Sequence, residues 1–109
     1  MSRDTTPETG TVKFNDSPDV LLRSAKIAVI HAFYKNDSSD DKIILTEDDI
    51  YIVWFSKTLQ NWKALLSTDL HDGLYYEVTY NGDKHSAYVD TYKKQSNTVV
   101  FQSDIARDL

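Results

Sequence analysis

Apolar residues recur along this chain at two spacings, first the period of a helix and then the period of two that marks strands. Ser17-Pro18-Asp19 predicts a helix start: Ser17 can accept a bond from an unpaired backbone N–H, Pro18 has none to lose, and Asp19 suits the positive helix end. The helical spacing then includes Leu21, Leu22, Ala25, Ala28, Val29, Ala32 and Phe33. We predict a helix ending near Lys35. Its stripe, widened by Ile27, Ile30 and Tyr34, indicates cover by a sheet or also by a second subunit.

The segment 50–93 changes to the period of two and predicts four short strands joined by tight turns. In the first strand, Tyr51, Val53 and Phe55 fall on one face. Ile50, Ile52 and Trp54 fall on the other. A strand that is apolar on both faces is usually central or covered twice, so we expect that position here. In the second strand, the residues predicted to share a face are Trp62, Ala64 and Leu66.

The last hairpin has the strongest signal, because Asn-Gly between two alternating segments is typical of a tight turn. We predict strands at 74–80 and 84–92, closed by either Asn81-Gly82 or Gly82-Asp83. Both registers bring the same faces together. The predicted core face holds Leu74, Tyr76, Val78, Ala87 and Val89, and the outer face holds Tyr75, Glu77, Thr79, Ser86, Tyr88, Asp90 and Tyr92. A slip of one residue would bury Glu77 and Asp90, which decides between the faces.

These elements predict an α+β fold, in which one N-terminal helix packs on a four- to five-stranded antiparallel meander as a two-layer sandwich. Residues 1–16 are expected to form a mobile tail, in which Val12 and Phe14 could add an edge strand. A single domain would span 17–101, followed by a C-terminal tail over 102–109. Two points stay open: Thr46–Asp49 forms a helical turn or a plain turn, and Val99–Phe101 adds a fifth strand or does not.

Composition narrows the function classes. The 109 residues include 12 Lys and Arg against 17 Asp and Glu, and a net charge of −5 disfavours general nucleic-acid binding. The absence of cysteine excludes disulfides, thiolate catalysis, zinc fingers and iron–sulfur clusters. We expect no signal peptide and no membrane span, because the first ten residues contain no apolar run and the longest later one is too short.

Three strings carry a resemblance to a known family: IYIVWFSKTLQN, then KALLST, then DGLYYEVTYNGDK. They resemble a family of small uncharacterised proteins from phages and prophages of Gram-positive bacteria, classed as a domain of unknown function. The resemblance covers about residues 20–95. It implies a phage accessory protein in the cytoplasm of a bacterial host, with no activity or catalytic residue to carry over. Related sequences often have Gly after Asn-Gly-Asp-Lys; His85 stands there in this chain, which leaves the backbone after the turn open.

The chemistry-bearing residues predict no active site. His31, His71 and His85 lack metal-ligand spacing, no Gly-rich phosphate loop is present, and we expect no metal and no cofactor. An enzymatic or small-ligand pocket between helix and sheet, lined by Tyr76, Tyr80 and His85, is an alternative. Catalysis there would need an enclosed polar pocket that brings His85 within hydrogen-bond reach of a carboxylate.

Two surfaces are candidates for contact with a protein, which is our leading prediction. One groups Tyr75, Tyr88 and Tyr92 with Glu77 and Asp90, where aromatic side chains would favour a partner from host or phage, or a second copy. The other is the acidic set Asp37, Asp40, Asp41, Glu47, Asp48 and Asp49, which could imitate DNA phosphates toward a basic groove. A minor virion structural or assembly role is a further alternative.

Overall fold

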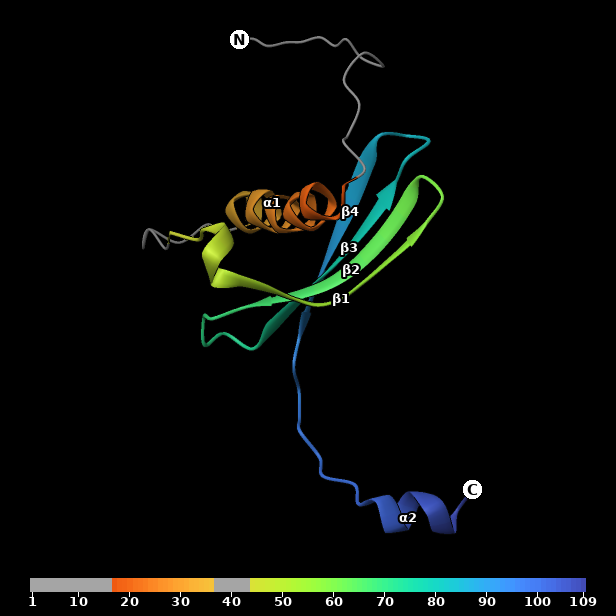
Figure 1. The fold of residues 1–109 in the computed structure, drawn as a ribbon. Helices are drawn as coiled ribbons and strands as arrows, with labels where there is room; N and C mark the ends of the chain where they lie inside the picture. The colour runs from red at the N-terminus through yellow and green to blue at the C-terminus, as the bar shows by residue number, and fades with distance from the viewer. Residues whose placement is uncertain (1–16, 37–43) are drawn as a thin grey trace, which may run out of the picture.

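The computed structural model describes residues 17–36 and 44–109 of the chain. Its elements are α1 (Pro18–Asn36), the 3-10 turn η1 (Glu47–Asp49), β1 (Ile50–Thr58), β2 (Asn61–Thr68), β3 (Leu74–Asn81), β4 (Ser86–Lys93) and α2 (Gln102–Arg107). The strands form one antiparallel sheet in the order β1-β2-β3-β4, and α1 lies across one of its faces (Figure 1). The predicted α+β arrangement is confirmed. The expectations for residues 1–16, including Val12 and Phe14, lie outside the described residues.

Helix α1 begins and ends where the sequence pattern predicts. The Ser17 carbonyl oxygen accepts the N–H groups of Val20 and Leu21, each at 3.1 Å, which pairs two donors of the first turn. The residues it buries are Leu21, Ala25 and Val29. Ile27 and Tyr34, which widen the predicted stripe, are exposed, so the face buried against the sheet is narrower than expected.

The segment before β1 forms the helical turn that the sequence left open. One carboxylate oxygen of Asp49 accepts the backbone N–H and the hydroxyl of Thr46, at 2.9 and 3.0 Å. The Tyr34 hydroxyl accepts the N–H of Leu45 at 2.8 Å, and Leu45 is buried. These contacts attach η1 to the end of α1 and set the start of β1.

The predicted faces of β1 are wrong after its third residue, because the strand contains a β-bulge. Ile52 is opposite Leu66 and Trp54 is opposite Leu65, so Val53 is an extra residue. The bulge brings Phe55 to the α1 side and turns Trp54 to the other side, where 41% of it is exposed. The predicted central position is also wrong, because β1 is an edge strand of the sheet that the described residues form.

The bulge completes a row of stacked rings on the α1 side of the sheet. Trp62 stacks between Phe55 and Tyr80, with ring centroids 5.4 and 5.3 Å apart. Stacked rings add to the free energy of apolar burial. The buried core that continues from this row consists of Leu21, Ala25, Val29, Leu45, Ile50, Trp62, Ala64, Leu66, Tyr76, Val78 and Tyr80. The predicted shared face of Trp62, Ala64 and Leu66 is confirmed.

The last hairpin has the predicted faces but a longer loop. Asn81 is opposite Ser86, so the loop has four residues, and neither two-residue turn is formed. Both predicted turns differ from this register by an even number, so the same residues still face each other. The Asn81 side-chain oxygen accepts the N–H groups of Asp83 and Lys84, and His85 follows with φ of +51°. This left-handed conformation favours glycine, the residue that the resemblance suggests at that position.

The chain after β4 does not return to the sheet. Residues 94–101 leave the sheet as an extended segment that ends in α2, and this C-terminal arm (94–109) is exposed throughout (Figure 1). Within the described chain the optional fifth strand at Val99–Phe101 is therefore not formed.

Any larger residue at position 82 should destabilise the protein, because the structure has no room there for a side chain. A Cβ there would overlap the Gln60 carbonyl oxygen, because the two hairpin loops are in contact. We expect Gly82→Ala and Gly82→Asn each to lower the free energy of unfolding by about 1–3 kcal/mol. Gly73, at φ of +71° in open space, is the control: Gly73→Ala should cost about 1–2 kcal/mol, but Gly73→Asn less, since Asn tolerates that backbone. Denaturant unfolding measures both pairs, and a Gly82→Asn protein as stable as wild type contradicts the contact.

His85→Gly should stabilise the protein by up to about 1 kcal/mol, because it relieves a left-handed backbone at a residue with a Cβ. His71→Gly is the matched control. His71 is exposed in a turn and has no positive φ, so that substitution should lower stability by about 0.5–1 kcal/mol through the freer unfolded chain. The opposite signs, read from urea midpoints, test the assignment; equal losses would refute it.

Candidate functional site

The sheet face turned away from α1 is uncovered in the described structure. The residues of this open face include Tyr51 and Trp54 on β1, Lys63 and Leu65 on β2, Tyr75 and Glu77 on β3, and Tyr88, Asp90 and Tyr92 on β4. It contains all five residues of the predicted tyrosine surface. The register brings Tyr75 opposite Tyr92 and Glu77 opposite Asp90. The alternation predicted that these residues share a face, but not these pairs.

The open face has aromatic sides and a charged centre. Tyr51 and Trp54 lie along one edge strand, and Tyr88 and Tyr92 lie along the other, with exposed fractions between 41% and 58%. Between them, the Lys63 ammonium lies 3.5 Å from a Glu77 carboxylate oxygen. The Tyr92 hydroxyl donates a long bond of 3.4 Å to the other Glu77 oxygen. The charged groups of Lys63 and Glu77 and the Tyr92 hydroxyl thus interact with one another, and the faces of the exposed aromatic rings remain available to contact a partner.

Sequence reasoning missed the part of this face on β1. A six-residue apolar run, from Ile50 to Phe55, contains no polar residue that would reveal a shift of one position. The bulge inside it is therefore invisible to the alternation, and Trp54 was predicted on the same side as Ile50 and Ile52. Its true position adds the largest aromatic side chain to the open face.

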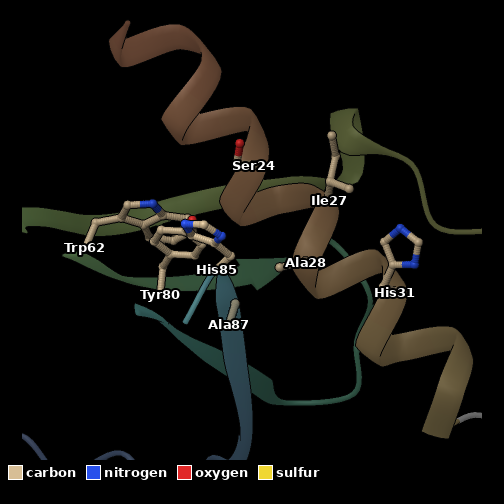
Figure 2. Close-up of a pocket in the computed structure, with 8 residues that line it drawn as sticks. All are labelled: Ser24, Ile27, Ala28, His31, Trp62, Tyr80, His85 and Ala87. Carbon is tan, nitrogen blue, oxygen red and sulfur yellow. The ribbon is translucent and has the colours of Figure 1, made fainter. Parts of the chain in front are cut away.

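A groove about 280 Å³ in volume lies between α1 and the hairpin end of the sheet. Its lining is Ser24, Ile27, Ala28 and His31 from α1, with Trp62, Tyr80, His85 and Ala87 from the sheet side (Figure 2). Tyr80 and His85 line it as predicted, but Tyr76 does not. His31 stands at the opposite end of the groove from His85 (Figure 2).

The lining of the groove is mostly apolar and includes no carboxylate among the described residues. The acid–base pair that catalysis at His85 would require is therefore missing from it. Burial raises the pKa of Tyr80, and burial together with the Asp72 carboxylate raises the pKa of Tyr76. Both phenols stay protonated near neutral pH, which makes them poor bases. Within the described structure the buried Trp62 Nε1 has no hydrogen-bond partner.

The acidic set is divided by the structure. Asp37, Asp40 and Asp41 lie outside the described residues, while Glu47, Asp48 and Asp49 form η1. Glu47 accepts two bonds from the Arg23 guanidinium, at 2.8 and 2.9 Å, and this bidentate pair lowers the pKa of Glu47. Asp49 caps η1, which leaves Asp48 as the exposed acid of the three. Two of these carboxylates thus hold local structure, and phosphate imitation stays a prediction.

Other site types find little support in the parts of the chain that the structure describes. There, no three His, Asp or Glu side chains are grouped to hold a metal ion. His71 is exposed, and the Asp72 side chain beside it accepts the N–H of Leu74, which shapes the β2–β3 turn. No helix among the described residues combines the length and apolar character that a membrane crossing requires.

Comparison with known proteins places the chain in a family whose function is unknown. Residues 22–102 match the model of a family of unknown function, DUF6275. Neither the curated proteins nor the solved structures contain a significant match. The match includes α1 from Leu22 onward, the whole sheet and the arm as far as Gln102. The predicted membership in a domain family of unknown function is confirmed.

The open face allows one test of its electrostatics. The Glu77 carboxylate is the main cause that raises the pKa of Tyr92, because its negative charge opposes the phenolate; Asp90 adds to it and Lys63 acts against it. Glu77→Gln should therefore lower the Tyr92 pKa, Asp90→Asn should lower it less, and Lys63→Gln should raise it. Phenolate absorbance during alkaline titration, relative to a Tyr92→Phe protein, measures the shift. An unchanged Tyr92 pKa in Glu77→Gln would contradict the arrangement.

Proposed function

The chain is a member of DUF6275, and we propose that it acts by binding a protein partner through the open face, without catalysis of its own. The observation that carries this proposal is the uncovered aromatic surface on both edge strands. Tyr51, Trp54, Tyr88 and Tyr92 keep 41–58% of their surface exposed on a rigid sheet. Tyr and Trp are enriched at protein interfaces, because they bury a large area at a small cost in side-chain entropy.

The charged centre favours binding of a specific partner over nonspecific hydrophobic association. The Lys63–Glu77 pair lies between the aromatic residues of β1 and β4, and Asp90 lies between Tyr88 and Tyr92 on β4, so a partner must offer matching polar groups there. Complementary charge sets the register and the association rate more than the affinity. An aromatic surface with a charged centre is typical of protein recognition. Stacking of nucleic-acid bases on it would be opposed, because Glu77 and Asp90 repel the phosphate backbone.

The groove supports the absence of catalysis in this proposal. Among the described residues its lining has no carboxylate of the kind that His85 would need, and its apolar residues offer shape and not reactive groups. The biological setting in the proposal rests on the sequence resemblance alone. We propose an accessory protein of a phage or prophage of Gram-positive bacteria, acting in the host cytoplasm on a host factor.

Affinity capture with matched variants tests the proposal. We expect the wild-type chain to retain a protein from extracts of infected or lysogenic host cells, identified by mass spectrometry. The double variant Tyr88→Ser/Tyr92→Ser should lose it, with an affinity for the purified partner that is weaker by roughly tenfold or more. Ile44→Ser is the control, because Ile44 is equally apolar and 77% exposed but lies outside the sheet.

Two results would overturn the proposal. Capture of no host or phage protein by the wild type removes the partner. Equal capture by the double variant and by Ile44→Ser would show that binding uses another surface.

A further inference from the structure

The C-terminal arm exposes a set of apolar side chains that its own chain does not cover. Val99, Val100 and Phe101 are 73%, 60% and 66% exposed, and Ile105 and Leu109 continue the set along and beyond α2. Contiguous exposed apolar side chains of this kind mark an interaction site. The family match runs through the first three of them to residue 102, so this part of the arm belongs to the domain.

The row of stacked rings ends in the groove beside β4, where an aromatic side chain like that of Phe101 could continue it. On the α1 side, Trp62 is opposite Tyr80 and Tyr80 is opposite Ala87, so these three residues form one line across the sheet. The stack of rings Phe55, Trp62 and Tyr80 follows this line and stops at β4, because Ala87 has no ring. Ala87 lines the groove and remains exposed (Figure 2). One further aromatic side chain would continue the stack.

We propose that two copies of this chain pair along β4, and that Phe101 of each arm fills the groove over Ala87 of the other copy. The spacing of Ala87 and Phe101 along the sequence agrees with this pairing. Lys94 ends the β3–β4 ladder, its N–H donating to the Gly73 carbonyl oxygen at 2.8 Å. Ala87 lies seven residues before Lys94 and Phe101 lies seven residues after it. An antiparallel pair with its two-fold axis at Lys94 therefore places Phe101 beside the partner's Ala87.

The alternation of side chains agrees with this register. A strand that continues from β4 keeps its odd-numbered residues on the α1 side, as Ala87 and Val89 are. Val99 and Phe101 then face the α1 side of the paired sheets, opposite Val89 and Ala87. Val100 falls on the open face beside Tyr88. α2 follows Phe101 directly, so in the proposed pair its exposed Ile105 would lie on the side of the other copy's α1, which carries the exposed Ile27.

A second copy fits the arm better than its own chain does. To bring Phe101 opposite its own Ala87, the arm would need a tight turn centred on Lys94, and Lys93-Lys94-Gln95 include no Gly, Asn or Pro. The turn-favouring Ser96 and Asn97 would lie beyond that turn. Pairing with a second copy needs no turn, because the arm already runs extended away from the sheet (Figure 1). It also covers the unpaired edge of β4, which a lone sheet leaves open to solvent. This inference does not depend on the proposed function, which uses the opposite face.

The first test measures the oligomeric state of the full chain and of matched variants. We expect light scattering to show a concentration-dependent dimer for the full chain. Phe101→Asp should weaken self-association roughly tenfold or more. Ala87→Phe should do the same by filling the groove from within its own chain. Leu59→Asp, which changes an equally exposed apolar residue in the β1–β2 turn, should leave the dimer intact. A strict monomer at all concentrations, or a dimer unaffected by Phe101→Asp and Ala87→Phe, overturns the proposal.

Cross-linking separates a second copy from the chain's own arm. The chain has no cysteine, so single substitutions report directly. A mixture of tagged Ala87→Cys and untagged Phe101→Cys should form the mixed disulfide on oxidation, whereas Leu59→Cys with Phe101→Cys should not. The double variant Ala87→Cys/Phe101→Cys should link mainly between chains. Formation of its bond within a monomer at high dilution, or absence of the mixed disulfide, overturns the proposal.

Discussion

A single helix covers one face of a four-stranded sheet, and the rest of the structure depends on that limited cover. A helix with its side chains is about 10–12 Å wide, while the outer strands of a four-stranded sheet lie about 14 Å apart. α1 buries Leu21, Ala25 and Val29 against the sheet, in which Ala64, Leu66 and Val78 of the middle strands are fully buried. Ala87 on β4 faces the same side but stays exposed. The groove beside β4 and the uncovered opposite face both follow from this shortage of cover.

The bulge at Val53 distributes the aromatic residues between the two faces. It brings Phe55 into the stack with Trp62 and leaves Trp54 on the open face. Without it, Phe55 would be turned outward and the stack would lose its first ring. One backbone irregularity on an edge strand therefore contributes both to the core and to the candidate recognition surface.

Sequence predicted those features in which a polar residue marks the choice. Ser17-Pro18-Asp19 fixed the start of α1, and Glu77 with Asp90 fixed the faces of the last hairpin. The β1 faces could not be predicted, because six consecutive apolar residues fit either side. The loop length after Asn81 could not be predicted either, since registers that differ by two leave the same faces in contact.

The arm shows a different limit of prediction. Val99–Phe101 has the composition of a strand, and a strand exists only where a neighbour pairs with it. In the described structure no neighbour pairs with this segment, so the segment forms no strand. Strand propensity indicates a segment that can pair, but it cannot indicate whether an edge, or which chain's edge, is there to pair with it.

The two proposed surfaces are connected by geometry although they lie on different sides of the sheet. Pairing along β4 would join two sheets into one, with both open faces on the same side, because alternation is conserved across the two-fold axis. Tyr88 and Tyr92 of each copy would then lie near the join. A partner with two matching sites would bind such a dimer more tightly than a monomer through effective concentration alone. Loss of Phe101 would then weaken partner binding without a change to any tyrosine.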